Sequence, residues 1–500
     1  MARSSKRIFI KRQWFHQNSL RLALHARLLR IGTLLIQNGV LVTSAGEMSA
    51  DVLIRNGIVE EITAQPKTKN QKPVTTFADR VIDATNKIIL PGLIDCHVHF
   101  REPGLEHKGD MASESAAAVA GGVTTVCDMP NTVPPTVTVA ALADKIRRAR
   151  DIKNCDLRFF MGVTQPPHLL AVRDVWIGSA AELQRLKKKC CGVKIYLDHS
   201  TGNQKIEGGL IEDVFKLCGE LKIPLVAHCE DAEMNAEKSE IVGPERSGPT
   251  ISDFSASLHS QRRPPESEAA SIAFAISLAR KYKTPFHVAH LSTSQGIDLV
   301  RNAKKEGLNV TCEVAPHHLF LSTDDYETLG TLGKMNPPLR SKDHVEALWK
   351  GIADGTVDCI ATDHAPHTLE EKKSDDPLKA PSGVPGVETM LPLLLSVVGR
   401  QWPHPNEKDQ RPRLRPPRAD YGGQANSKGQ LTYSDIVRLC FENPNQIFNL
   451  GKKGIVEGAS ADLIIVDPKK EWVIEGKKLH SKCQWTPYEG WHVHGIIECM

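Results

Sequence analysis

The sequence lacks any long hydrophobic run. No stretch of about 18 apolar residues occurs, which is the shortest run typical of a membrane-spanning helix. Charged residues make up 24% and hydrophobic residues 40% of the 500 residues, both ordinary values for a soluble globular chain. The composition therefore predicts a protein that does not cross a membrane.

The twelve cysteines include no Cys-x-x-Cys pair. Several of them, such as Cys127, Cys229, Cys312 and Cys359, lie inside apolar runs that are typical of buried strands. This pattern argues against a disulfide framework and against a zinc ribbon. It predicts buried free thiols in a reducing compartment, and we expect a cytoplasmic protein.

Acidic residues are absent from residues 1–30, which carry eight Lys or Arg. An acid-free, Arg-rich, amphipathic leader is typical of a mitochondrial or plastid transit peptide, and the alternative for residues 1–32 is a disordered extension or a misplaced start codon. Subtracting those eight from the 63 basic residues leaves 55 against 59 acidic residues, a net charge of −4. The body of the chain therefore predicts no basic surface for nucleic acid.

From residue 94 onward the chain alternates short apolar runs with Ala- or Leu-rich helical stretches. The candidate strands are residues 94–100, 124–129, 157–163, 193–197, 225–228, 287–290, 310–314 and 359–362. The candidate helices between them are residues 113–120, 139–150, 180–189, 211–221, 267–280, 294–305 and 342–353. Eight strand and helix units in order predict an α/β fold with a (β/α)8 TIM-like barrel. An open doubly wound sheet is the alternative, which the absence of a Gly-rich phosphate loop after the first strand disfavours.

Short strand-like segments lie on both sides of the barrel. Residues 33–62 alternate in hydrophobicity with turn signals at Asn38-Gly39 and Asn56-Gly57, and residues 454–466 do the same. We expect residues 33–90 and 452–500 to form a small β-sandwich subdomain beside a barrel of residues 91–451. Residues 400–430, crowded with Pro, Arg, Gln and Gly, predict a disordered surface insertion, and a last helix is expected at 433–441.

Ligand-type side chains gather at the predicted carboxyl ends of the strands, where barrels of this class carry their active sites. His97 and His99 share one face of the first strand, and Arg101 continues that face. A single histidine at a strand end is usually a hydrogen-bonded core residue, but here six candidates converge. Together they predict a centre for two Zn2+ ions, with ligands His97, His99, Lys194, His228, His290 and Asp363.

Lys194 lies in the apolar run of residues 192–197. A lysine buried there without a partner would be expensive, and the alternative is that it faces outward or reaches the rim. Our hypothesis is that two divalent cations depress its pKa, that the amine captures carbon dioxide, and that the carbamate bridges the metals. Such a metal pair lowers the pKa of a bridging water to about 7, and Asp363 would take its proton and pass it to a leaving nitrogen. The predicted reaction is hydrolysis of an amide-like bond.

With these residues identified, the chain resembles the cyclic amidohydrolases of the amidohydrolase superfamily, and most closely the dihydroorotase family. The resemblance runs from about residue 33 to residue 491, and the motifs that carry it are residues 91–104, 128–132, 226–230, 289–293, 335–340 and 361–367. It implies that His97, His99 and Asp363 hold one zinc, that His228 and His290 hold the other, and that carboxylated Lys194 bridges both. Some members place an aspartate on a loop where others have the bridging lysine, and this chain is similar to the lysine kind.

The resemblance also implies a substrate pocket. Arg101, Asn131 and His367 match carboxylate-binding positions, while Asn336 and the Ser382-Gly383 turn match positions that touch the substrate ring. Dihydroorotate is a cyclic ureide that carries a carboxylate, for which arginine offers a planar bidentate fork. The implied reaction is the reversible conversion of (S)-dihydroorotate to N-carbamoyl-L-aspartate in pyrimidine synthesis.

Other assignments stay open. Dihydropyrimidinases, hydantoinases and allantoinases are the alternative enzymes, with Arg101 as the discriminating residue, and an inactive scaffold is a further alternative although no metal ligand is missing. Thr201, in the stretch 198–203, either contacts ligand or only shapes a turn. His287 and His364 are expected to point away from the site, and His317 and His318 to lie in an outer shell. We also expect a small-molecule substrate and a homo-oligomer, taken as a dimer, with association with aspartate carbamoyltransferase left open.

Overall fold

The computed structural model describes residues 32–65, 78–198, 204–242, 256–374, 379–399 and 430–499. The predicted N-terminal leader (1–32), Thr201 and the predicted insertion (400–430) therefore lie outside the described ranges. The exceptions are residue 32 of the leader and residue 430 of the insertion, which are described. Within these ranges, no helix combines the length and the apolar character that a membrane crossing requires.

Eight parallel strands form the central sheet, and they follow one another in chain order. They are β6 (Leu93–Val98), β7 (Val123–Asp128), β8 (Asp156–Gly162), β9 (Cys190–Tyr196), β10 (Leu225–His228), β11 (Phe286–Val288), β12 (Val310–Val314) and β13 (Cys359–Ile360). The two outer strands meet through a bridge between Val98 and His364 and through the carboxylate of Asp95, which accepts the Thr362 N–H at 3.0 Å. The predicted barrel of eight strands is confirmed.

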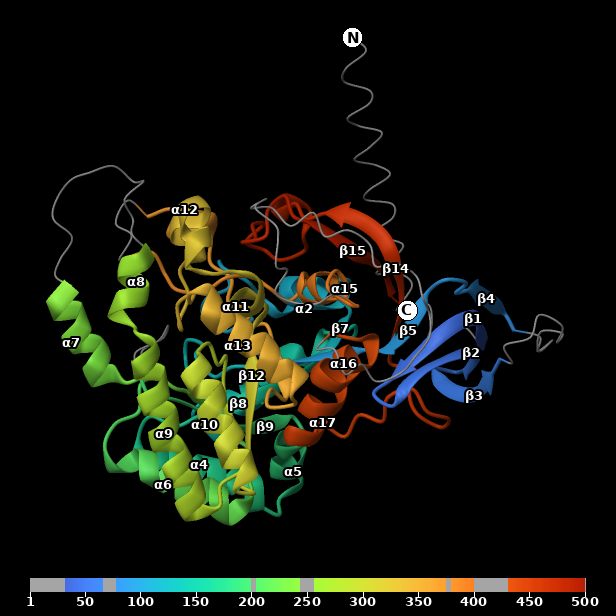
Figure 1. Ribbon diagram of the computed structural model, residues 1–500. Helices are drawn as coiled ribbons and strands as arrows, with labels where there is room; N and C mark the ends of the chain where they lie inside the picture. Colours follow the sequence, from blue (N-terminus) through green and yellow to red (C-terminus); the bar gives the residue numbers. More distant parts are fainter. Residues whose placement is uncertain are drawn as a thin grey trace, which may run out of the picture.

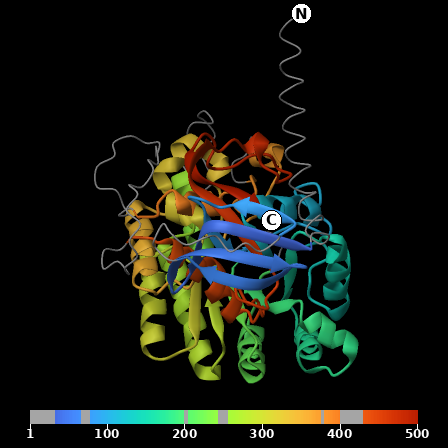
Figure 2. The same ribbon diagram turned by 90° about the vertical axis from the view of Figure 1, so that its right-hand side faces the viewer.

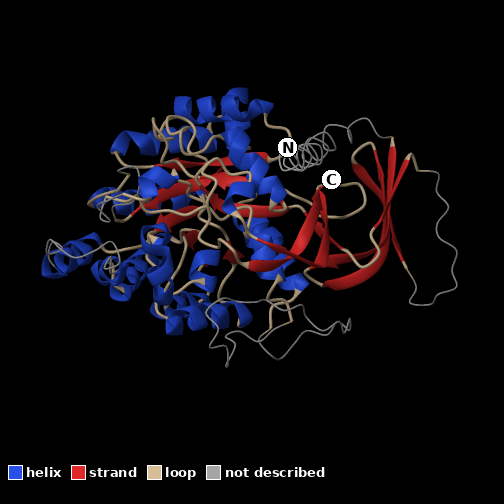
Figure 3. Ribbon diagram, turned by 90° about the horizontal axis from the view of Figure 1, so that it is seen from above, coloured by secondary structure: helices blue, strands red, loops and turns tan. Residues whose placement is uncertain are grey.

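Helices surround this sheet (Figures 1 and 3). Those that connect successive barrel strands are α2 (Met111–Ala120), α3 (Val139–Arg148), α4 (Pro166–Ile177), α5 (Ala181–Lys187), α6 (Gly209–Leu221), α7 (Ala232–Val242), α8 (Ala256–Arg262), α9 (Pro265–Tyr282), α10 (Ser294–Lys305), α11 (Pro316–Phe320), α12 (Tyr326–Leu329) and α13 (Lys342–Ala353). After β13 come α14 (Leu369–Lys372), α15 (Met390–Leu395), α16 (Tyr433–Val437), a π-helical turn (Arg438–Glu442) and α17 (Asn443–Ile447).

Five of the connecting helices lie where no helix was predicted, namely α4, α7, α8, α11 and α12. Helix α4 begins at Pro166, and its Pro166-Pro167 pair occupies the first turn, where a proline costs no hydrogen bond. Helices α7 and α8 precede α9 in the connection between β10 and β11, and they extend to one side of the barrel (Figure 1).

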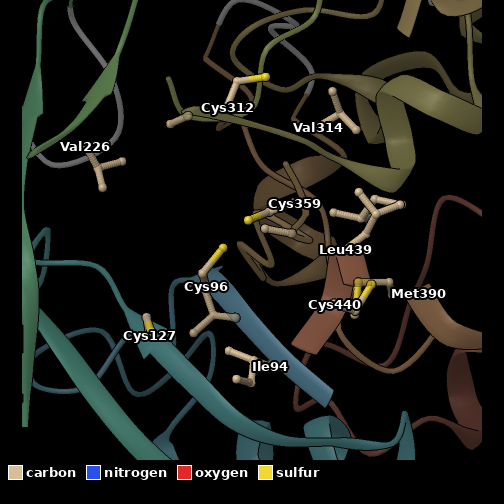
Figure 4. Close-up of a cluster of buried hydrophobic side chains, with 14 of the residues drawn as sticks. Ile94, Cys96, Cys127, Val226, Cys312, Val314, Cys359, Met390, Leu439 and Cys440 are labelled. Atoms are coloured by element: carbon tan, nitrogen blue, oxygen red, sulfur yellow. The ribbon is translucent and has the colours of Figure 1, made fainter. Parts of the chain in front are cut away.

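The barrel strands are mainly apolar because both of their faces are largely buried. Thiols are part of this core, and Figure 4 shows Cys96, Cys127, Cys312, Cys359 and Cys440 among its aliphatic side chains. The cysteines that the structure describes are free, and all but the half-buried Cys190 are buried. The predicted buried free thiols are therefore confirmed.

A second sheet contains strands from the N-terminal and the C-terminal parts of the chain, and it lies beside the barrel (Figures 2 and 3). Its strands are β1 (Thr33–Thr43), β2 (Gly46–Arg55), β3 (Ile58–Ala64), β4 (Arg80–Asp83), β5 (Ile88–Pro91), β14 (Leu463–Val473) and β15 (His492–Cys499). Along β14, Ile464 and Val466 join the barrel core, whereas Leu463 and Ile465 join the sheet's own core. The alternation of side chains along the strand thus fixes the sheet to the barrel.

One of the two predicted turns in this sheet is wrong. Asn56 and Gly57 both have positive φ, as a two-residue hairpin between β2 and β3 requires. Asn38 and Gly39 instead form a bulge inside β1, where the register to β2 shifts. The reason is that Asn38, with φ of 62°, donates its N–H to Asp51 at 2.8 Å, so its turn chemistry bends the strand without ending it.

Candidate metal centre

Three of the predicted ligands meet at the carboxyl ends of the first and eighth strands. His97 belongs to β6, His99 follows it, and Asp363 lies just after β13. The Oδ1 atom of Asp363 is 3.3 Å from Nε2 of His97 and 3.0 Å from Nε2 of His99. Burial opposes ionisation of Asp363, but the two histidines hold its pKa well below the usual range. All three side chains are buried and close enough to bind one metal ion.

Two further histidines lie beside this group. His228 ends β10 and His290 follows β11, and their Nδ1 and Nε2 atoms are 3.0 Å apart. The rings of His97 and His290 are 5.2 Å apart between centroids, so the four imidazoles form one cluster. The structure thus brings the predicted histidines of both metal positions together.

Lys194 lies on β9 and is fully buried. Its Nζ atom has no hydrogen-bond partner among the described residues. Burial lowers its pKa to about 8, although Glu313 and Asp363 act in the opposite direction. A buried amine with this pKa is partly unprotonated at neutral pH, which is the form that reacts with carbon dioxide.

The outer nitrogens of the histidines are engaged by acceptors. Nδ1 of His97 donates to Glu313, and Nδ1 of His99 donates to Oδ1 of Asn131 at 2.7 Å. The inner Nε2 atoms are then lone-pair acceptors, and both face an oxygen of Asp363. Three acceptors this close repel one another unless a cation lies among them, so these residues fit a metal ion of the kind that nitrogen and carboxylate ligands hold.

Glu313, on β12, is the hub of a second buried group behind the histidines. Besides the bond from His97, it accepts Cys96 Sγ–H at 3.4 Å, His287 Nε2–H at 3.1 Å and the His290 main-chain N–H at 3.2 Å. Burial raises the pKa of Cys96 well above its usual value, so this thiol stays protonated. The group can therefore orient His97 through ordinary hydrogen bonds.

Arg101 lies two residues beyond His99 and is buried. Its Nε donates to the carbonyl of Pro366 at 3.0 Å, and its Nη2 is 3.0 Å from Nε2 of His367. Burial lowers its pKa to about 10, which still leaves it charged at neutral pH. Within the described ranges no carboxylate lies at ion-pair distance from this guanidinium, although an unpaired buried cation is costly.

The remaining predicted pocket residues lie around Arg101. A small cavity is lined by His99, Arg101, Asn131, Asn336, Asp363, Ala365, Ser382 and Gly383. His367 packs directly behind Arg101, and Ser382 Oγ donates to Asn336 Oδ1 at 3.2 Å. The cavity thus has the metal group on one wall and the arginine on another.

Three site residues have a left-handed backbone. The φ angles of Arg101, His290 and Asp363 are 68°, 33° and 47°. Such conformations cost about 1 to 3 kcal/mol each for residues other than glycine, and they cluster where function requires them. Arg101 and Asp363 line the cavity and His290 belongs to the adjacent histidine cluster, so these conformations mark the site independently of the ligand pattern.

The other histidines occupy distinct positions. His364 donates its Nε2–H to Glu114 at 2.8 Å and faces away from the cavity, as predicted. His318 bonds the carbonyl of Pro337 at 3.0 Å. His317 is buried near Asp363 and His97, and burial, reinforced by His97, lowers its pKa to about 4.

Comparisons with known proteins identify the family. A model of the amidohydrolase family matches residues 88–490. The chain is 38% identical over 454 residues to a dihydroorotase of Halobacterium salinarum, covering 90% of this chain and 93% of that one. It is 36% identical over 450 residues to a dihydroorotase of Methanosarcina acetivorans, covering 88% and 85%. The chain belongs to the amidohydrolase family, among the dihydroorotases.

This amidohydrolase also matches part of a longer protein and several solved structures. It is 35% identical over 430 residues to the multifunctional protein CAD of Squalus acanthias, covering 85% of this chain but 15% of that protein. The solved L-hydantoinase (dihydropyrimidinase) of Arthrobacter aurescens is similar with a TM-score of 0.78 at 25% identity, over 93% and 95% of the two chains.

Sequence reasoning missed several residues that support this amidohydrolase site. Glu313 lies inside an apolar strand, and Glu230, which faces Nε2 of His228 at 3.0 Å, follows the motif histidine by two positions. Lys372 is fully buried and donates to the carbonyls of Lys334, Pro381 and Gly383 at 2.8 to 3.1 Å. Glu230 carried a signal, since a carboxylate beside a ligand histidine is a common partner for its outer nitrogen.

Proposed function

We propose that this amidohydrolase is a dihydroorotase, which hydrolyses the ring amide of (S)-dihydroorotate to N-carbamoyl-L-aspartate and catalyses the reverse ring closure. The observation that carries the proposal is Arg101, a buried cation without a carboxylate partner at ion-pair distance among the described residues, in the wall of the cavity that holds the candidate metal group. A ligand that brings its own carboxylate supplies the missing counter-charge. Dihydroorotate is a cyclic amide with such a carboxylate, whereas hydantoin and dihydrouracil carry none.

Substrate recognition divides between two walls of the cavity. We assign the substrate carboxylate to Arg101, Asn131 and His367. Asn131 lines the same cavity as Arg101, and His367 lies 3.0 Å from the Arg101 guanidinium. We assign the ring to Asn336 and the Ser382-Gly383 turn, which Lys372 fixes through the Gly383 carbonyl. This orientation directs the scissile amide toward Asp363 and the histidines.

We assign one Zn2+ to His97, His99 and Asp363, the other to His228 and His290, and the bridge to Lys194. When bound, the ions act as Lewis acids on the scissile carbonyl and make water a nucleophile at neutral pH. Lys194 prepares the bridge: its nitrogen forms a bond to the carbon of carbon dioxide and loses one proton to solvent. An anionic carbamate then replaces a buried amine, which removes the cost of a cation beside metal ions.

Asp363 moves the proton in the reaction. Its low pKa leaves it ionised, so it accepts a proton from the attacking water and passes that proton to the ring nitrogen as the C–N bond breaks. Ring closure consumes a carboxylate and a proton, so it is favoured at lower pH, and hydrolysis at higher pH.

The test is to assay purified protein against dihydroorotate, dihydrouracil, hydantoin and allantoin, with zinc quantified in the same sample. We expect turnover of dihydroorotate, and Arg101→Met should lose it while its zinc content stays that of the wild type. The exposed Arg280, which pairs with Glu306, provides the matched control Arg280→Met. Turnover of hydantoin or dihydrouracil but not of dihydroorotate would replace the assignment by a hydantoinase or dihydropyrimidinase.

The carbamate has its own test. Native mass measurement of the zinc-loaded protein should show the added mass of carbon dioxide, and Lys194→Met should lose both this mass and bound zinc. A zinc-loaded wild type with an unmodified Lys194 contradicts the bridge but not the substrate. For assembly we keep the prediction of a homodimer, which sedimentation of the same sample checks.

A further inference from the structure

His367 is enclosed by groups whose hydrogen-bonding role is fixed. The ammonium of Lys108 lies 3.1 Å from Nδ1, and it can only donate. The main-chain carbonyl of Ser382 lies 3.1 Å from Nε2, and it can only accept. Arg101 Nη2, again only a donor, lies 3.0 Å from the same Nε2. The ring is fully buried, and burial together with the cations Arg101, Lys108 and Lys372 holds its pKa well below the usual range, so it is neutral.

The two neutral forms of this ring satisfy different neighbours. With the proton on Nε2, the ring donates to Ser382 and accepts from Lys108, and only the contact with Arg101 sets two donors face to face. With the proton on Nδ1, the ring accepts from Arg101, but Nδ1–H faces the Lys108 ammonium and the Nε2 lone pair faces the Ser382 oxygen. Glu371 raises the pKa of the ring and is the group near Nδ1 that favours a proton there, but its Oε2 is 3.8 Å from Nδ1, beyond hydrogen-bond distance, and accepts the Thr368 N–H at 3.0 Å instead. The Nε2–H form therefore has two good contacts and the other form has one.

We propose that Lys108 is a positioning residue that holds His367 in its Nε2–H form, so that Arg101 and His367 present two N–H donors to the carboxylate of the substrate. The inference rests on the proposed dihydroorotase function and assigns a role to a residue outside the motif positions. In the free site the two donors face each other at 3.0 Å. A carboxylate oxygen that accepts from Arg101 Nη2 and shares the His367 Nε2–H with the Ser382 carbonyl turns this unfavourable contact into two charge-assisted bonds.

The surroundings of Lys108 suit this role. Its ammonium is held by Glu371 Oε1 at 3.0 Å, and its side chain is 12% exposed, so its position is fixed. Glu371 is itself fixed, because it forms a capping box with Thr368 at the start of α14. On the opposite side, a Cβ on Gly383 would lie 3.1 Å from Nε2 of His367, so only glycine leaves that nitrogen room for a ligand.

The experiment compares Lys108→Met and Lys108→Arg with Lys482→Met in the zinc-loaded full chain. Lys482 is the matched control because it pairs with Asp110 in the neighbouring loop at 2.9 Å without touching His367. We expect Lys108→Met to raise KM for dihydroorotate about tenfold or more with kcat within about threefold, Lys108→Arg to recover most of the loss, and Lys482→Met to match the wild type.

The second readout is the protonation of His367 in the free enzyme, from two-bond 1H–15N spectra of histidine-labelled protein, assigned with His367→Gln. We expect the proton on Nε2 in the wild type and a shift toward Nδ1 in Lys108→Met. A wild-type proton on Nδ1, or an unchanged KM in a folded Lys108→Met, overturns the inference. Because the spectra need no substrate, failure of the wild type to turn over dihydroorotate counts against the proposed function and leaves this readout intact.

Discussion

The indole Nε1 of Trp485 donates a hydrogen bond of 2.7 Å to the main-chain carbonyl of His367. Trp485 lies in the segment between β14 and β15, which leaves the sheet and packs on the barrel. There the Lys482 N–H donates to Glu114 at 3.0 Å, and the His480 N–H donates to Glu388 at 2.7 Å. A part of the chain that the sequence assigns to the small subdomain therefore supports the residue that we place at the substrate carboxylate.

Trp485→Phe tests this support, because it keeps an aromatic ring and removes only the donor. Loss of one such hydrogen bond costs about 1 kcal/mol of stability. We expect a KM for dihydroorotate raised several-fold, with zinc content unchanged. The control is Trp472→Phe, since Trp472 donates to the Gly495 carbonyl at 3.1 Å within the sheet. It should lose similar stability and keep its KM, and equal KM values for the two variants would contradict the coupling.

Glu313→Gln should weaken metal binding. An amide in this position has only one acceptor oxygen, so its NH2 group meets a donor from His97, His287 or Cys96. Removing the outer partner of a ligand histidine typically lowers metal affinity 10- to 100-fold, or about 1.4 to 2.7 kcal/mol. Dialysis against a graded zinc chelator measures the loss. Glu306→Gln, at an exposed ion pair with Arg280, should retain wild-type zinc affinity, and an unchanged affinity in Glu313→Gln would contradict the orienting role.

The barrel could be predicted from the sequence because the signals that identify its strands are local. Apolar runs of strand length identify β6 to β13, and a histidine at a strand end must face the same rim as the others. The role of Glu313 could not be predicted in this way. Nothing within residues 310–314 shows whether its carboxylate points into the barrel or out of it. Lys108 and Trp485 act on His367 from 259 and 118 positions away, which only the folded chain brings together.

Local structure was predicted wrongly or missed where the same residue type occurs in two kinds of backbone structure. The Pro166-Pro167 pair is a helix start in α4 although prolines commonly break helices. Asn38-Gly39 bends a strand although the same pair type at Asn56-Gly57 makes a hairpin. For Asn38 the outcome depends on Asp51, which accepts the Asn38 N–H from the neighbouring strand and which local propensity does not contain.

Gly383→Ala should damage the pocket more than a left-handed glycine usually would. Gly383 has φ of 136°, and a Cβ would lie 2.8 Å from the carbonyl oxygen and 2.9 Å from the Cβ of Ala365. Gly355 is the matched control, with φ of 78° and open space around its missing Cβ. Backbone strain alone costs about 1 to 2 kcal/mol. We expect Gly355→Ala to show only this loss in urea unfolding, and Gly383→Ala to lose more stability and to raise KM.

His317 makes stability depend on pH. Burial, with a contribution from His97 and against that of Asp363, lowers its pKa from 6.5 to about 4. The folded protein therefore binds fewer protons than the unfolded chain between these values, so stability falls as the pH decreases from 6.5 toward 4. The loss approaches about 1.4 kcal/mol per pH unit for one group. We expect urea unfolding at pH 7, 6 and 5, with zinc present, to give a flatter profile for His317→Gln than for the wild type. Identical slopes for His317→Gln and the wild type would rule out this contribution of His317.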